Sequence, residues 1–240
     1  MSNGTPHPGT REEFVFEGHR CVVYVPDMPA PGRPWIWRTE FLGAFDTVDR
    51  ALVARGWHLV TVSLSDRYGC PSAVEDMHSF HGMVTERYAL PAKAVMEGFS
   101  RGGLYACNYA RRYPELVAGL YLDAPVLDIR SWPGGKGAGR CSPDCWVECL
   151  EIYGLTEETV KDFTDQPLDH AAEFARFPVL LIVGAADTDV PYAENGEPFA
   201  RVLREQGCDL CVIVKPDCAH HPHSLEDPAP AVEFIESHMM

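Results

Sequence analysis

The string Gly98-Phe99-Ser100-Arg101-Gly102 places a serine between two glycines, directly after an apolar run and directly before a helical stretch. A nucleophilic serine on a sharp strand-to-helix turn needs such small neighbours, because its backbone is strained there. The following helix would offer free backbone N–H groups and the positive end of its dipole to a developing oxyanion. Ser100 is therefore a candidate nucleophile for acyl transfer.

A serine hydroxyl is a weak nucleophile near neutral pH, so it needs a base, and the base needs an acid that orients it. Asp187 ends the apolar run LLIVGAAD, and the order serine, acid, histidine is the one expected for this kind of turn. Asp189, two residues later, and Asp123, which follows the preceding sheet strand, are the alternatives. We favour Asp187 because it terminates the apolar run, whereas Asp189 fits a cap of the turn before Pro191.

The candidate base is His220, in the string CAHHPH that follows the last predicted strand. It comes first after the strand and has the smallest neighbour, an alanine, so we favour it over His221 and His223. These two are expected to be structural. Because the carboxyl ends of parallel strands meet at one edge of a sheet, Ser100, Asp187 and His220 can converge there.

The elements that must position these residues follow an alternating pattern. Two β-rich runs, at 12–17 and 20–26, predict a hairpin. Strands and helices alternate after it, which predicts an α/β fold with a mostly parallel sheet, helices on both faces and an antiparallel edge. Residues 127–176 lack a strand pattern, so we expect a short cap insertion within a single domain spanning 1–240. The expected strands are 34–37, 58–64, 94–99, 117–126, 178–187 and 208–216, and the expected helices are 46–55, 72–88, 101–113, 197–206 and 227–235.

The second of these helices carries the clearest start signal. Ser72 and Glu75 have the spacing of a capping box, in which both side chains satisfy free N–H groups at a helix start. We therefore expect this helix to begin near Ser72 and to bury one face against the sheet. The residues that recur at helical spacing on that face are Val74, Met77, His81, Val84 and Tyr88.

Over nearly its whole length the chain resembles serine hydrolases of the α/β-hydrolase fold. Ser100 matches the nucleophile of that family, Asp187 in GAADTDVP matches the acid after the penultimate strand, and His220 matches the late histidine. The strings GFSRGGLY, SWPGGKG and HHPHSLEDP are similar to a subgroup of small bacterial hydrolases described as esterase-like. The resemblance implies hydrolysis of an acyl bond through an acyl-enzyme, with no cofactor.

We expect a carboxylic ester hydrolase that acts on a small-molecule ester, either small or sugar-linked, because the insertion is short and the mouth of the site looks polar. A small serine peptidase or an acyltransferase is the alternative among enzymes. A catalytically silent ligand-binding module on the same fold is the alternative outside enzymes, since fold alone does not give function.

The oxyanion hole is expected to use the N–H of Arg101 as its first donor. The family often carries His-Gly after its third strand, where this chain has Trp37-Arg38. The resemblance therefore implies that the second donor is the N–H of Trp37 or of Arg38.

Residues after the predicted strand ends could shape the mouth of the site. Arg67, together with Arg38 and Arg101, could bind an anionic group of the substrate. Tyr68 and Trp132, with Trp35 and Trp37, could form a stacking platform, and the alternative for these aromatic residues is ordinary core or wall. The alternative for the arginines is ion pairing with nearby carboxylates, namely Glu40, Asp66 and Asp128.

Composition excludes several function classes. The chain has 240 residues, 46% of them hydrophobic, and 20 Lys and Arg against 35 Asp and Glu give a net charge of −15. Such a field repels phosphate backbones and excludes nucleic acid as a partner, and the absence of a long apolar run excludes a membrane span. The start of the chain is polar, unlike a secretory signal, so the 9 cysteines are expected to be reduced thiols of a cytoplasmic protein. Cys208 and Cys211 would point to opposite faces of a strand, so we expect no metal site from them.

Overall fold

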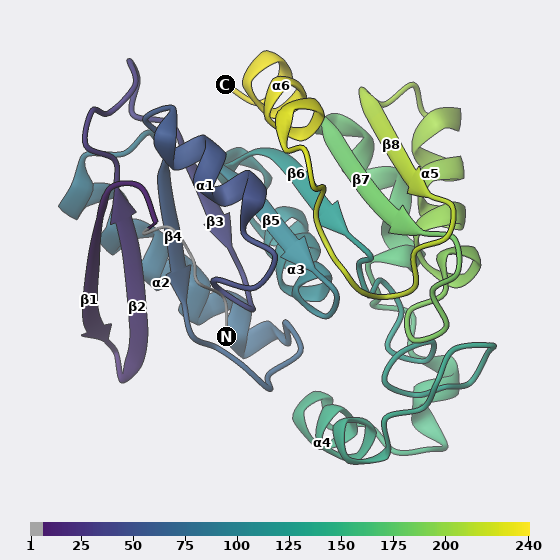
Figure 1. Cartoon of the computed structure of the whole chain (residues 1–240). Coiled ribbons are helices and arrows are strands. Elements are labelled where there is room, and N and C mark those ends of the chain that lie inside the picture. Colours follow the sequence, from purple (N-terminus) through teal and green to yellow (C-terminus); the bar gives the residue numbers. More distant parts are fainter. Residues whose placement is uncertain (1–6) are drawn as a thin grey trace.

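A computed structural model of the chain describes residues 7–240 and is built around one sheet (Figure 1). The strand order is β1-β2-β4-β3-β5-β6-β7-β8. The β1–β2 and β2–β4 pairs are antiparallel, and every other pair of neighbours is parallel. The polar start, predicted not to be a secretory signal, falls mostly on residues 1–6, outside the described residues. The strands are β1 (Thr10–Phe16), β2 (His19–Val25), β3 (Trp35–Arg38), β4 (His58–Val62), β5 (Ala94–Phe99), β6 (Val117–Asp123), β7 (Val179–Gly184) and β8 (Leu210–Lys215).

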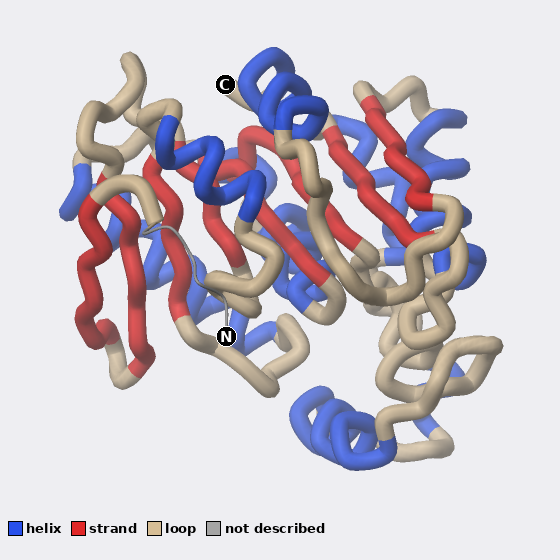
Figure 2. The backbone as a smooth tube through the Cα atoms, viewed as in Figure 1, coloured by secondary structure: helices blue, strands red, loops and turns tan. Residues whose placement is uncertain are grey.

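Helices cover both faces of this sheet (Figure 2). One hydrophobic core packs α2, α3 and α5 against one face, and a second packs α1 and α6 against the other. Trp35 and Trp37 belong to the first core and Ile36 to the second, as the alternation of strand side chains requires. The predicted fold class, an α/β-hydrolase fold, is confirmed. The helices are α1 (Thr47–Ala54), α2 (Pro71–Tyr88), α3 (Gly102–Arg112), α4 (Pro143–Tyr153), α5 (Gly196–Glu205) and α6 (Ala229–His238).

Helix α2 has the predicted buried face but not the predicted start. All five residues expected on that face are buried. The helix begins at Pro71, with Cys70 at the N-cap position and no side-chain cap. Proline suits the first helical position because it has no N–H to satisfy there. The Ser72 hydroxyl instead accepts a hydrogen bond from Arg67 at 2.8 Å, so the predicted capping box is wrong.

The segment between β6 and β7 forms no strand, and all of it is described. It carries α4 and the short 3₁₀ helices η2 (Thr159–Asp162) and η3 (Leu168–Arg176). In Figure 1, α4 lies beyond the ends at which β5, β6 and β7 point. The cap insertion expected at 127–176 falls inside this segment. Within residues 7–240, no helix is both long and apolar enough to span a membrane.

Two buried histidines have pKa values well below that of a free imidazole. Burial lowers the pKa of His58 and that of His81 to about 4 in each case. The His81 ring donates from Nε2 to the Ala92 carbonyl and accepts from the Tyr109 hydroxyl at Nδ1, both at 2.8 Å. A pKa of about 4 keeps the His81 ring neutral at pH 7, and a neutral ring has the one donor and the one acceptor that these two bonds use.

These histidines predict a loss of stability in acid. The free energy of unfolding should fall as pH drops from 6.5 towards about 4, because the unfolded chain binds protons there that the folded chain does not. Above pH 6.5 this loss is absent. In His58→Leu one of the two groups is gone, so urea unfolding across this window should give a flatter dependence on pH than the wild type. An equal slope in the two proteins would contradict the assignment of His58.

Candidate active site

Ser100 sits on a strained turn between β5 and α3. Its φ is +50°, a left-handed backbone conformation that residues other than glycine rarely adopt. The Ser100 N–H donates to the Asp123 carbonyl at 2.9 Å, and the Val126 N–H donates to the Ser100 carbonyl at 2.8 Å, which hold this conformation. A Cβ on Gly98 would lie 2.8 Å from the Gly102 carbonyl oxygen, so only glycine fits beneath the turn.

A chain of hydrogen bonds runs from this serine to a carboxylate. The Ser100 Oγ lies 2.9 Å from His220 Nε2, and His220 Nδ1 lies 2.7 Å from Asp187 Oδ2. All three residues are buried. The other oxygen of Asp187 accepts the N–H groups of Asp189 at 2.8 Å and Val190 at 2.9 Å, which fixes the carboxylate. The structure thus joins Ser100, His220 and Asp187, the three residues predicted from the sequence, by two consecutive hydrogen bonds.

The alternative acid, Asp123, holds a different histidine. Its oxygens accept hydrogen bonds from His223 Nδ1 and from the Ser224 N–H, both at 2.7 Å. Asp187 follows β7, which is the neighbour of β8, so its loop lies beside the histidine loop. Two carboxylate–histidine pairs therefore stand next to each other at this edge of the sheet, and one of them contacts Ser100. The strand β7 ends three residues before Asp187, earlier than the apolar run suggested.

A cavity of about 410 Å³ opens in front of Ser100. Its volume falls in the range of small-molecule sites, which is roughly 300–1,000 Å³. Trp132, one of the predicted substrate contacts, belongs to its wall. The lining residues are Phe41, Ala44, Phe45, Phe99, Ser100, Trp132, Asp189, His220, His221 and His223.

The segment that lies against the serine turn differs from the prediction. Trp37 and Arg38 are inside β3, between β4 and β5, so their backbone N–H groups belong to the sheet. The loop after β3 reaches the turn instead, because a Cβ on Gly102 would meet Thr39 Oγ1 at 2.9 Å and the Glu40 nitrogen at 3.8 Å. The structure therefore places the loop after β3 beside the serine turn and keeps Trp37 and Arg38, the expected second donors, within the sheet.

Arg38 organises that loop from inside the protein. Its side chain is 1% exposed and donates from Nη1 to Asp49 at 2.7 Å and to Glu97 at 3.3 Å. It also donates to the carbonyls of Glu40 at 3.1 Å and Ala44 at 2.6 Å. Burial, together with the nearby Asp49 carboxylate, raises the pKa of Glu97 well above its usual value. The raised pKa favours the protonated, neutral form of Glu97, which leaves Asp49 as the carboxylate that pairs with Arg38.

This arrangement predicts unequal costs for two substitutions. Arg38→Met should destabilise the protein by about 3–5 kcal/mol, because it leaves the Asp49 carboxylate buried without a partner. Glu97→Gln should cost about 1 kcal/mol or less, because the amide keeps the size and the neutrality of the protonated carboxyl. Chemical denaturation of both variants measures the difference. Equal costs would contradict the neutral state of Glu97.

The remaining predicted contacts lie outside the wall of the cavity. Arg101 forms ion pairs with Glu40 at 2.6 Å and with Asp66 at 2.7 Å. Both carboxylates were named above as alternative partners of the arginines. Arg67 forms an ion pair with Asp76. These pairings occupy the guanidinium groups that were expected to meet an anionic substrate.

Tyr68, also expected at the mouth, is fully buried. Its hydroxyl donates to Glu148 at 2.6 Å, and its ring packs 6.4 Å from that of Trp132. It therefore supports the cavity wall from behind. Trp35 and Trp37 are core residues, so the predicted aromatic platform is reduced to Trp132.

Comparison with known proteins decides the family. A family model described as the prolyl oligopeptidase family matches residues 72–239, well over half of the chain. The chain belongs to the prolyl oligopeptidase family. The matched part contains Ser100, Asp187 and His220, and it leaves out β1 to β4 and α1.

Curated relatives of this family member include both peptidases and an esterase. Acylamino-acid-releasing enzyme 2 of Oryza sativa subsp. japonica is 25% identical over 143 residues, which are 54% of this chain and 17% of that protein. Pimeloyl-[acyl-carrier protein] methyl ester esterase of Shewanella sp. (strain MR-7) is 35% identical over 96 residues, 34% of this chain and 36% of that protein. The chain thus spans about a sixth of the length of the first relative and about a third of the second.

Solved structures share the fold of the whole chain. The acylaminoacyl peptidase of Pyrococcus horikoshii superposes with a TM-score of 0.72 at 15% identity, over 96% of this chain and 42% of that chain. Dipeptidyl peptidase 4 of Porphyromonas gingivalis gives a TM-score of 0.68 at 14% identity, over 97% of this chain and 36% of that chain. At such identities the likeness shows the α/β-hydrolase fold alone.

Proposed function

We propose that the protein is a serine hydrolase that cleaves carboxylic esters through an acyl-enzyme. The observation that carries this proposal is the hydrogen-bond chain from Ser100 through His220 to Asp187, with the serine on a strained turn at the floor of a cavity. Residues held in rare backbone conformations such as this one cluster at active sites.

Ser100, His220 and Asp187 each have a separate role in this reaction. As the Ser100 oxygen attacks the acyl carbon, its proton passes to His220 Nε2. Asp187 keeps the proton of His220 on Nδ1 and stabilises the imidazolium that forms. His220 then gives its proton to the leaving alcohol. In the second half, His220 takes a proton from water as the water oxygen attacks the acyl carbon, and it returns this proton to Ser100 Oγ as the bond from Oγ to the acyl carbon breaks and the acid leaves.

The oxyanion would be held by two backbone N–H groups. The N–H of Arg101 precedes the first turn of α3, where helix N–H groups lack intrahelical acceptors. We assign the second donor to Glu40 or Phe41 in the loop after β3, because the N–H of Thr39 already donates to the Glu97 carbonyl at 3.0 Å. The ion pair between Arg101 and Glu40 ties the two donor segments to each other.

The cavity favours a compact acyl group. Three phenylalanines and Trp132 line it. Among the described residues of its wall, Asp189 is the one carboxylate, and there is no lysine or arginine that could bind an anionic substrate. Aromatic walls suit short acyl chains or the apolar face of a sugar, so we propose small or sugar-linked esters as substrates.

A panel of chromogenic substrates tests this proposal. We expect 4-nitrophenyl acetate and butyrate to be hydrolysed, with kcat/KM at least about tenfold lower for the dodecanoate, whose chain exceeds the cavity. An acetyl-alanine 4-nitroanilide serves as the peptidase probe, because family membership and the acylamino-acid-releasing relatives make peptide cleavage the second candidate. Rate enhancements over the uncatalysed reactions, rather than raw rates, are compared. A larger enhancement for the anilide than for every ester would replace ester hydrolysis by peptide hydrolysis.

We also propose that the protein works in a reducing compartment, the cytoplasm. All nine cysteines are free thiols, and several are buried in the core. Free thiols in that number suit a compartment in which disulfides do not persist.

A further inference from the structure

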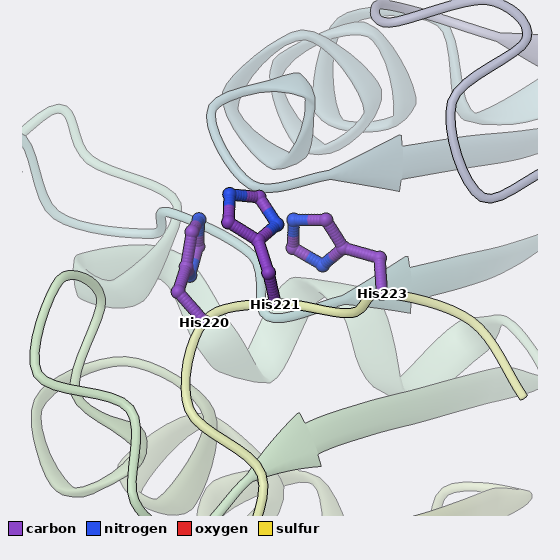
Figure 3. Close-up of side chains that lie close together, drawn as sticks. All are labelled: His220, His221 and His223. Atoms are coloured by element: carbon purple, nitrogen blue, oxygen red, sulfur yellow. The ribbon is translucent and has the colours of Figure 1, made fainter. Parts of the chain in front are cut away.

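Three histidines that line the cavity form a compact cluster (Figure 3). They are His220, His221 and His223, and each offers one ring nitrogen that lies within 4.8 Å of the nitrogens offered by the other two. The ring centroids are 4.8 to 4.9 Å apart in every pair. The mechanism proposed above uses only His220, so the cluster holds two more imidazoles than ester hydrolysis needs.

Two of these rings are already oriented as metal ligands are. His220 and His223 each donate from Nδ1 to a buried carboxylate, Asp187 and Asp123 respectively, at 2.7 Å. A metal-binding histidine almost always donates its other ring N–H to such an acceptor, which fixes the ring and makes the free nitrogen more basic. In both residues Nε2 is then the unprotonated nitrogen, whose lone pair can bind a metal ion. A buried carboxylate lies behind each ring.

The third ring completes the set. His221 is exposed, and among the described residues none forms a hydrogen bond with its imidazole. Phe45 stacks against it, with centroids 5.4 Å apart. Three nitrogens around tetrahedral zinc stand about 3.4 Å from one another. Binding would therefore require a rotation of the exposed His221 ring and shifts of the other two rings towards each other.

We propose that His220, His221 and His223 bind a divalent transition-metal ion such as zinc and that this ion switches the active site off. Imidazole is a preferred ligand of zinc, copper and nickel. A metal bound to Nε2 of His220 takes the lone pair that now faces Ser100 at 2.9 Å. The serine then has no base, and removal of the metal restores it. The binding stands on the cluster alone, whereas the inhibition rests on the proposed function.

Zinc calorimetry on the EDTA-treated, desalted full chain tests the binding. We expect one zinc ion per chain, an affinity weaker by about 100-fold in His221→Ala, and an affinity weaker by about 10- to 100-fold in Asp123→Asn, which removes the acceptor behind His223. His238→Ala is the matched control, because His238 also pairs with a carboxylate, Asp209 at 2.6 Å, but lies in α6. Circular dichroism verifies that each variant is folded. Absence of binding, or equal affinities of His221→Ala and the wild type, overturns the site.

Fluorophosphonate labelling of Ser100 with zinc or with EDTA tests the switch. Zinc should slow labelling of the wild type by at least about tenfold, and the ratio of rates in EDTA and in zinc should approach one in His221→Ala. Zinc that binds the cluster without slowing the labelling overturns the switch and leaves the site. If the wild type fails to label even in EDTA, the proposed function fails, and calorimetry alone decides the metal site.

Discussion

Ser100→Ala should abolish ester hydrolysis, with a loss of roughly 10⁴- to 10⁶-fold in kcat, while the fold remains intact. The loss is large because, among the described residues that line the cavity, Ser100 alone carries a hydroxyl or thiol that could form the acyl-enzyme. The fold should tolerate the change, since Ala89 and Ala124 already adopt φ values of 51° and 42° in this chain, close to that of Ser100. Turnover of 4-nitrophenyl acetate, with thermal unfolding as the test of folding, measures both parts.

The matched control is Ser131→Ala, which removes the hydroxyl of another buried serine. The Ser131 hydroxyl donates to Glu194 at 2.7 Å and accepts from Asn195 at 3.0 Å, and Ser131 is not one of the residues that line the cavity. This variant should retain most of the wild-type rate. A Ser100→Ala protein that kept more than a few per cent of the activity, with contamination excluded, would remove Ser100 as the nucleophile.

Asp187→Asn should be the most damaging aspartate substitution, with a loss of about 10³- to 10⁴-fold in kcat. The asparagine can turn its NH₂ group towards His220 Nδ1, which must then accept a hydrogen bond instead of donating one. The ring proton moves to Nε2, where the lone pair for the serine proton should be. The charge that stabilises the imidazolium is lost as well.

Asp123→Asn and Asp189→Asn are the controls for this prediction. Asp123 contacts His223 rather than His220, and the Asp189 carboxylate faces Arg140 at 3.7 Å. Each should lower kcat by about tenfold or less, because neither sets the tautomer of His220. If Asp123→Asn proved worse than Asp187→Asn, the acid of the site would be Asp123.

The serine, the acid and the histidine could be predicted because each follows a strand that the apolar pattern marks. The order of strands in a parallel sheet then places Asp187 beside His220. The partner of Asp123 could not be predicted in this way. His223 lies 100 residues further along the chain, and the choice among three neighbouring histidines depends on side-chain directions in an irregular loop.

The buried group of Arg38, Asp49 and Glu97 beneath the loop after β3 was not predicted, for a related reason. Asp49 has the spacing of an ordinary polar residue in a short helix, and Glu97 is a single charge inside the apolar strand AVMEGF. Glu97 was the available signal, because a glutamate on a strand buried on both faces needs a partner or a proton. Arg38 became the partner of Asp49 inside the protein, which removed it from the mouth where strand-end reasoning placed it.

The most direct measurement of the central claim is peptide mapping by mass spectrometry after reaction with a fluorophosphonate. The reagent reports the nucleophile itself, since the serine oxygen displaces fluoride and stays bonded to phosphorus. We predict a single adduct on Ser100, which disappears in Ser100→Ala and forms at least about 100-fold more slowly in His220→Ala. A wild-type protein that is folded but takes up no label, or that carries its adduct on a residue other than Ser100, would contradict the account.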